Sequence, residues 1–177
     1  MRPPRYFRLV ASLLLLAGCQ GKRPPAPTTS PLTYPLQTVR AMVAPPAGWL
    51  PDPLKYSSSH THQVWLSPSG HTAYGVIHFT LPLPVSANFL LPFYLRAWKK
   101  DQGEATLLSK VDDPALPGIR FVAEGGRYKT WSNLIVSGLE GWSIYAGVVR
   151  GQPILQPELD LAISAREHTH VGLPESK

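Results

Sequence analysis

The chain has 177 residues, of which 44% are apolar, and it carries 17 Lys and Arg against 11 Asp and Glu. This length suits one domain of ordinary size with a connecting segment. The basic residues form no run longer than the pairs Lys22-Arg23 and Lys99-Lys100, which argues against a nucleic-acid-binding surface. A single cysteine excludes an internal disulfide, so the folded part must be stabilised by its apolar core.

The beginning of the chain has the order of an export signal. Arg2, Arg5 and Arg8 precede an apolar run from Leu9 to Leu16 that only Ser12 interrupts. A bilayer span needs about 20 apolar residues, so this run is too short to be one. A charged start, an apolar run and then small residues are typical of a secretory signal. We therefore expect residues 1–18 to be a signal peptide.

The apolar run closes with Leu16-Ala17-Gly18-Cys19, which resembles the lipobox of bacterial lipoproteins. The resemblance implies cleavage between Gly18 and Cys19, a diacylglyceryl thioether on Cys19 and a further acyl chain on its new amino group. Two or more acyl chains anchor a protein stably in a bilayer, whereas a single acyl chain binds it only weakly and reversibly. The lipid bilayer, reached through acylated Cys19, is thus an expected partner.

The residue after the cysteine bears on which membrane the anchor enters. In the lipoprotein family an aspartate at this position is the usual signal for retention in the inner membrane, so Gln20 implies the outer membrane, facing the periplasm. As the alternative, Cys19 can be an ordinary small buried apolar residue. The polar, proline-rich segment that follows offers it no core.

Residues 19–37 are expected to form the lipidated start and a spacer. Five prolines lie among Gly, Ser, Thr and Lys in this segment, at positions 24, 25, 27, 31 and 35. Such a sequence cannot donate a full set of backbone hydrogen bonds and favours an extended polyproline conformation. Residues 38–177 are then expected to form a single globular domain.

The domain is predicted to begin with strands. Residues 39–43 are predicted to form a first strand. A turn should end this strand at the sequence Pro45-Pro46-Ala47-Gly48-Trp49. Residues 60–66 and 72–81 flank Ser67-Pro68-Ser69-Gly70 and predict a hairpin.

A helix should follow the hairpin. Ser86 is a suitable N-terminal cap and Gly103 a suitable stop. Pro92 fits easily if the helix starts at Leu90 or Leu91, but a start at Ser86 requires a kink. The stripe expected to be buried contains Phe89, Leu90, Phe93 and Trp98, with Lys99, Lys100 and Asp101 in water.

The rest of the chain predicts four more strands and a closing helix. The expected strands are residues 105–111, 119–124, 128–136 and 142–149. The last of these strands is apolar on both faces, which is typical of a strand in the middle of a covered sheet. Residues 157–169 predict a helix that packs on the sheet through Leu159, Ala162, Ile163 and Arg166.

This order predicts an α+β fold with a mostly antiparallel sheet and helices packed on it. The order of elements, with Gly48-Trp49 near the start and an amphipathic helix at the end, resembles the PsbP-like fold. The resemblance covers about residues 38–172 and implies an α/β/α sandwich. It assigns no functional residue.

Histidines are the best candidates for chemistry. His60 and His62 should project from the same face of a strand, a spacing that lets two imidazoles share a metal ion. With Leu66 opposite His71, His62 would face about position 75 and His60 about position 77, while His78 points the other way. The alternative is that both are solvent-facing polar residues. His168 and His170 diverge if they lie on a helix, where interaction with its negative end is the favoured explanation.

No strong catalytic motif is present. The serines at positions 57–59 lack the Gly-x-Ser-x-Gly pattern of a nucleophile. Asp112-Asp113 before Pro114 suggests a turn. Gly125-Gly126 is not followed by the Lys-Ser or Lys-Thr sequence of a phosphate-binding loop.

Five aromatic residues can line a ligand groove or simply pack in the core: Trp65, Trp131, Trp142, Tyr128 and Tyr145. The sequence favours a non-catalytic binding or scaffolding module of the cell envelope, with no cofactor and with envelope proteins as possible partners. The alternatives are a metal-binding periplasmic lipoprotein that uses His60 and His62, and a hydrolase.

Overall fold

The structure is a computed structural model that describes residues 32–53, 55–56, 60–113 and 117–172. The expected signal peptide, Cys19 and most of the expected spacer lie outside the described residues, as do the serines at positions 57–59. Within the described part, no helix is long and apolar enough to cross a membrane.

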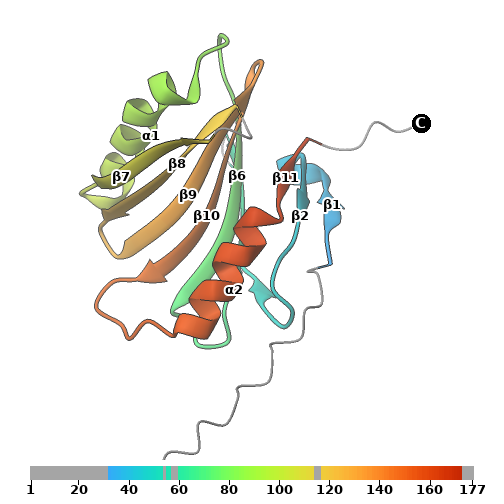
Figure 1. Cartoon of the computed structure of the whole chain (residues 1–177), viewed down its shortest axis with the longest axis vertical. Helices are drawn as coiled ribbons and strands as arrows, with labels where there is room; N and C mark the ends of the chain where they lie inside the picture. Colours follow the sequence, from blue (N-terminus) through green and yellow to red (C-terminus); the bar gives the residue numbers. More distant parts are fainter. Residues whose placement is uncertain (1–31, 54, 57–59, 114–116, 173–177) are drawn as a thin grey trace, which may run out of the picture.

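The described chain forms an α+β fold with two antiparallel sheets (Figure 1). The large sheet has the order β3-β5-β6-β10-β9-β8-β7, with β4 also paired to β5, and the small sheet has the order β1-β2-β11. In chain order the elements are β1 (Tyr34–Leu36), the 3-10 helix η1 (Gln37–Val39), β2 (Ala41–Val43), β3 (Leu50–Pro51), β4 (Lys55–Tyr56), β5 (His60–Leu66), β6 (Thr72–Thr80), α1 (Ala87–Gln102), β7 (Thr106–Asp113), β8 (Gly118–Gly125), β9 (Tyr128–Ser137), β10 (Glu140–Val149), α2 (Gln156–Glu167) and β11 (His170–Val171).

The two helices cover opposite faces of the large sheet. Strand β10 shows this most clearly, because its residues alternate between the two faces. Trp142, Ile144 and Ala146 pack in one core cluster with residues of α2. Ser143, between Trp142 and Ile144, contacts Tyr94 of α1 through its hydroxyl. The expected position of this strand in the middle of a covered sheet is confirmed.

The hairpin of β5 and β6 is confirmed, but its register differs from the expected one. Leu66 pairs with Ala73 rather than His71, and His62 pairs with Ile77. The turn is longer because the amide of Ser67 donates to the carbonyl of Thr72 at 2.9 Å. The two-residue shift keeps the same faces, so His78 still lies opposite to His60 and His62.

Helix α1 starts at Ala87, where the Ser86 hydroxyl accepts from the amide of Phe89 at 3.2 Å. It ends at Gly103, whose φ of 83° is left-handed. Pro92 therefore lies inside the helix, where it leaves the carbonyl of Asn88 without a helical donor.

The buried face of α1 differs from the predicted stripe. Phe89 and Phe93 are 59% and 50% exposed, whereas Ala87 and Leu91 are buried. Leu90, Tyr94, Leu95 and Trp98 also pack on the core cluster beneath the helix. Two residues along a helix turn by about 200°, so Phe89 and Phe93 lie on the side opposite to Leu91.

The folded part begins earlier than expected. Tyr34–Leu36 pairs with β2, so these residues belong to the domain and not to the spacer. Pro35 lacks a backbone donor, and such residues are tolerated on an edge strand like β1. The first predicted strand, residues 39–43, is shorter, since Gln37–Val39 forms η1 and Arg40 has a left-handed φ of 50°.

Helix α2 and the strand after it close the fold. Leu159, Ala162 and Ala165 are buried against the sheet. Arg166 is also buried, and it belongs to the helix face that the sequence predicts to pack on the sheet. The helix ends at Glu167 rather than Thr169, and His170–Val171 pairs with β2. Trp65 and Trp142 are buried in the cluster under α2, so packing in the core is confirmed for these two aromatics.

Candidate functional site

The histidine pair of β5 lies on one face of its strand. His62 pairs with Ile77 and His60 with Phe79, so both project to the face that carries α1. The Nε2 atom of His62 is 2.6 Å from the hydroxyl of Tyr145. Burial raises the pKa of Tyr145, so its phenol is protonated at neutral pH. Across the described residues no three His, Cys, Asp or Glu side chains come close enough to hold a metal ion.

The second histidine pair is separated by the end of α2. His168 is the C-terminal cap, and its Nδ1 atom lies 2.8 Å from the carbonyl oxygen of Ser164. This contact confirms the expected interaction with the helix end. His170 lies beyond the helix, in β11.

Asp112 and Asp113 are the last two residues of β7, and the residues that follow them in the expected turn, 114–116, lie outside the described residues. Asp112 accepts from the side-chain amide of Asn88 at 2.9 Å, and Asp113 accepts from Nε of Arg120 at 2.8 Å. Asp113 is buried, so this ion pair with Arg120 compensates a charge that would otherwise be costly.

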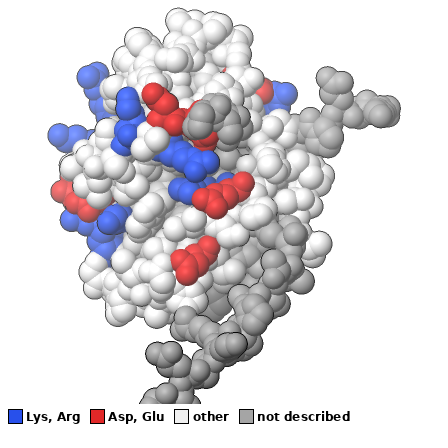
Figure 2. Space-filling view, viewed as in Figure 1, with Lys and Arg blue, Asp and Glu red and all other residues white. Residues whose placement is uncertain are grey.

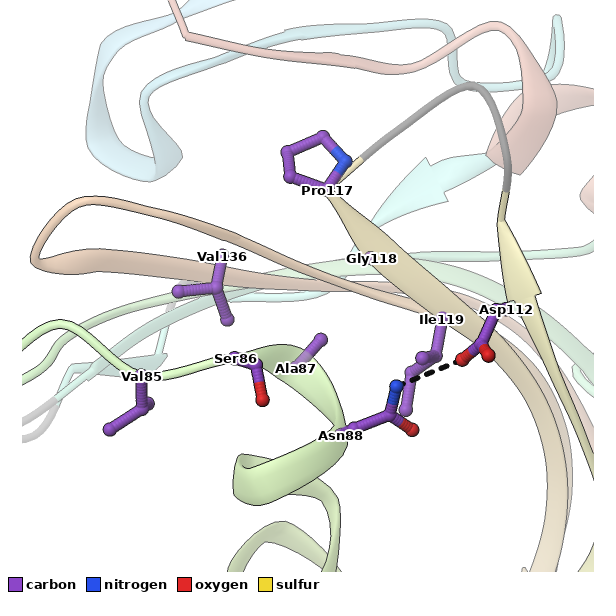
Figure 3. A pocket seen from close by; sticks show the side chains of 9 residues that line it. All are labelled: Val85, Ser86, Ala87, Asn88, Asp112, Pro117, Gly118, Ile119 and Val136. Atoms are coloured by element: carbon purple, nitrogen blue, oxygen red, sulfur yellow. Dashed lines mark hydrogen bonds between the residues drawn. The ribbon is translucent and has the colours of Figure 1, made fainter.

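A first hollow of about 400 Å³ lies at the start of α1 (Figure 3). Its polar groups already bind one another, because Asn88 donates to Asp112 and accepts from Nζ of Lys110 at 2.7 Å. Ser86 is occupied as the helix cap. Little polar capacity is left here to recognise a ligand.

A second hollow of about 530 Å³ lies where α2 ends, and we call it the helix-end pocket. Its lining residues come from the sheet, from the last turn of α2 and from β11: Arg120, Asn133, Ile135, Glu167, Thr169, His170 and Val171. Volumes of about 300 to 1,000 Å³ are typical of small-molecule sites.

Strand register builds the sheet wall of this pocket. Arg120 of β8 pairs directly with Asn133 of β9, so both side chains project to the same face. Asn133 in turn pairs with Ile144, which packs in the cluster under α2. The side chains of Arg120 and Asn133 therefore lie on the face of the sheet that carries α2.

The opposite wall is fixed by hydrogen bonds at the end of α2. The Thr169 hydroxyl donates to the carbonyl of Ala165 at 2.8 Å and lies 2.5 Å from the hydroxyl of Tyr74. The pairing of His170 with Met42 then holds β11 against the small sheet. These bonds hold the backbone that presents Glu167 and His170 in place.

Asn133 is the unusual residue of the pocket. It is only 5% exposed, and its Oδ1 atom is buried without a hydrogen-bond partner in the part of the chain that the structure describes. An unsatisfied buried polar group costs about 1–3 kcal/mol. A bound molecule that donates to this oxygen would remove that cost.

A second unsatisfied group belongs to Arg166. Its Nη2 atom donates to Oε1 of Glu167 at 3.2 Å, while Nε is buried with no partner among the described residues. Burial lowers the pKa of Arg166, and the neighbouring carboxylate of Glu167 opposes that shift. The guanidinium nevertheless stays charged at neutral pH.

Sequence reasoning did not single out Arg120, Asn133 or Glu167. The available signal is weak: Asn133 is a strongly polar residue within the largely apolar stretch Trp131-Ser132-Asn133-Leu134-Ile135. Polar side chains in such positions need partners. Which partners they have depends on β8 and α2, which are distant in sequence.

No family model matches the chain, and no curated protein matches it. Among solved structures, it is similar to a protein from Bacteroides thetaiotaomicron, with a TM-score of 0.46 and 11% sequence identity. The similarity covers 84% of this chain and 51% of the other, so the chain spans about half the length of that protein.

Proposed function

We propose that the protein is a membrane-anchored bacterial lipoprotein whose folded domain binds a small ligand without catalysis. Support for the anchor comes from Leu16-Ala17-Gly18-Cys19 behind a signal-like segment. Acylated Cys19 holds the protein to the bilayer, and Gln20 favours the outer membrane, facing the periplasm. Envelope proteins are further possible partners of such a domain.

The unsatisfied Oδ1 of Asn133 is the observation that carries the binding function. Asn133 lines a hollow of about 530 Å³ together with a cationic residue and apolar residues, and its Oδ1 atom has no hydrogen-bond partner among the described residues. Pockets with a few polar groups among apolar ones are typical of ligand sites. The first hollow has polar groups too, but they are paired with each other.

The chemistry of the lining supports binding without catalysis. The hydroxyl of Thr169 is engaged with Ala165 and Tyr74, and within the described part of the chain no histidine is among its hydrogen-bond partners. A nucleophile needs such a base within hydrogen-bond reach. No specific observation favours the hydrolase alternative.

The layering of the domain also supports a PsbP-like fold. One helix lies on each face of an antiparallel sheet, and the closing helix α2 packs against β10 and β6. We propose this relationship for the domain from Tyr34 onwards.

Native mass spectrometry of the mature protein, purified from membranes, tests the binding function. We expect a small molecule to co-purify, to be lost in Asn133→Leu and to be kept in the control variant Asn88→Ala. The leucine replaces an unsatisfied polar group by an apolar one, so the unliganded fold should be as stable as before.

Two results would contradict this function. One is a protein without any bound molecule, and the other is a ligand retained equally in Asn133→Leu. Stoichiometric zinc or copper that is lost in the double variant His60→Ala/His62→Ala would favour the metal-binding alternative instead.

A further inference from the structure

The helix-end pocket carries charges of opposite sign on its two walls. Arg120 belongs to the sheet wall, and Glu167 belongs to the wall formed by the end of α2. Both side chains are about half exposed, so a molecule that enters the pocket can reach them.

Each of these two side chains keeps hydrogen-bonding capacity. Arg120 donates to Asp113 through Nε, and a guanidinium group has four further N–H donors on its two terminal nitrogens. Those nitrogens match the two oxygens of a carboxylate. Glu167 accepts from Arg166 through Oε1, and its Oε2 atom remains for a donor such as an ammonium group.

This arrangement selects against simple ions. A small anion beside Arg120 is repelled by Glu167, and a small cation beside Glu167 is repelled by Arg120 and by Arg166. These repulsions are stronger in a partly desolvated pocket than in water. A molecule that carries both charges avoids them, because each end can face the wall of opposite sign.

Asn133 fits such a molecule as well. Its Oδ1 atom is buried and lacks a donor among the described residues, so a rotation of the side chain towards the pocket would let it accept from an ammonium group, which has three donors. With its amide turned over, the same side chain would present its NH₂ group to a carboxylate. Ile135 and Val171 add an apolar surface to the same lining, which suits an aliphatic side chain.

We propose that the helix-end pocket binds a zwitterion, namely a free amino acid or a dipeptide with an aliphatic side chain. The carboxylate of the ligand binds Arg120, and its ammonium group binds Glu167 and Asn133. This inference rests on the proposed ligand-binding function and names the chemical class of the ligand.

Matched probes test the inference on the full-length protein. Leucine, valine and alanyl-leucine carry both charges, isocaproate lacks the ammonium group, isoamylamine lacks the carboxylate, and N-acetyl-leucine amide has neither. At saturating concentration we expect at least one zwitterion to raise the melting temperature by about 3 °C. The three other compounds should shift it by less than about 1 °C.

A charge variant gives a second readout. Glu167→Gln removes the partner of the ammonium group from a half-exposed position, so it should weaken zwitterion binding about tenfold in calorimetric titration while allowing isocaproate to bind. Asp160→Asn removes an exposed carboxylate from the same helix and serves as the control, with binding unchanged. Arg120 is left intact because its loss would strand the buried Asp113.

Either of two results overturns the inference. If isocaproate binds the wild-type protein as well as leucine does, the pocket is a site for simple anions, and the proposed binding function stands. If no zwitterion binds, the ligand class is wrong, and the mass measurement on protein from membranes decides separately whether the pocket binds anything.

Discussion

His78 lies on the α2 side of the sheet, in a crowded polar environment. Its side chain is 11% exposed, its ring centre is 5.2 Å from that of Trp142, and its Nε2 atom is 3.9 Å from Oε1 of Glu140. Nε2 has no hydrogen-bond partner among the described residues. Burial lowers the pKa of His78, with Arg40 acting in the same direction and Glu140 in the opposite one.

The lowered pKa of His78 predicts a loss of stability in mild acid. In the unfolded chain a histidine titrates near its ordinary pKa of about 6.5, so as the pH falls the unfolded state takes up the proton first. The contribution of His78 to stability is therefore present above about pH 6.5 and is lost as the pH falls towards the pKa of the folded state.

Urea unfolding at about pH 7.5 and about pH 5 measures this effect. We expect His78→Gln to show a smaller fall in the free energy of unfolding between these two values than the wild-type protein. His71→Gln removes a partly exposed histidine from the turn before β6, and this control should behave like the wild type. If the free energy of unfolding falls as much in His78→Gln as in the wild-type protein, His78 does not cause the loss of stability in mild acid.

At the scale of the elements, the pairing of β6 and β10 depends on a glycine. Gly75 lies opposite Tyr145, and a Cβ atom at Gly75 would come within 2.4 Å of Cζ in the tyrosine ring. The ring therefore lies directly over Gly75, in a position from which its hydroxyl reaches His62. Gly147 is in the same strand as Tyr145 but has ordinary space, with its nearest neighbour at 3.5 Å.

We predict that Gly75→Ala destabilises the fold by about 2 kcal/mol, because overpacking in a filled position commonly costs about 1–3 kcal/mol. Gly147→Ala, the matched control in the neighbouring strand, should change stability by less than about 0.5 kcal/mol. Urea denaturation of both variants is the measurement. Equal stability of the two would mean that the tyrosine ring moves aside at no cost.

The elements also show which parts of the fold can be predicted from the sequence. The β5–β6 hairpin, the cap of α1 and the four strands from β7 to β10 follow from local patterns such as period-two alternation and turn residues. The register of the hairpin does not, because it depends on how Ser67 and Thr72 close the turn. The predicted buried stripe of α1 is wrong for Phe89 and Phe93, because these two side chains are exposed although they are apolar.

The helix-end pocket could not be predicted, for a different reason. Arg120, Asn133 and Glu167 come from β8, β9 and α2, and their proximity depends on sheet order and on the packing of α2. The Oδ1 atom of Asn133 has no partner among the described residues that would reveal its role. Long-range placement of this kind leaves almost no trace in a single sequence.

At the scale of the whole molecule, the expected anchor and the pocket are joined through the small sheet. Leu32 and Thr33 lead to β1, which pairs with β2, and β2 pairs with β11, whose two residues line the pocket (Figure 1). On the face seen in Figure 2, basic and acidic side chains are intermixed instead of forming one basic surface. A mixed distribution of this kind argues against a polyanion-binding surface on this face.

The mass of the mature protein, extracted from its native membrane, tests the proposed lipid anchor most directly. We predict a chain that starts at Cys19 and carries a diacylglyceryl group and an additional acyl chain, both absent from a Cys19→Ala variant, which stays at precursor length. A wild-type protein with an unmodified thiol, or one whose first residue lies upstream of Cys19, would contradict the proposed anchor.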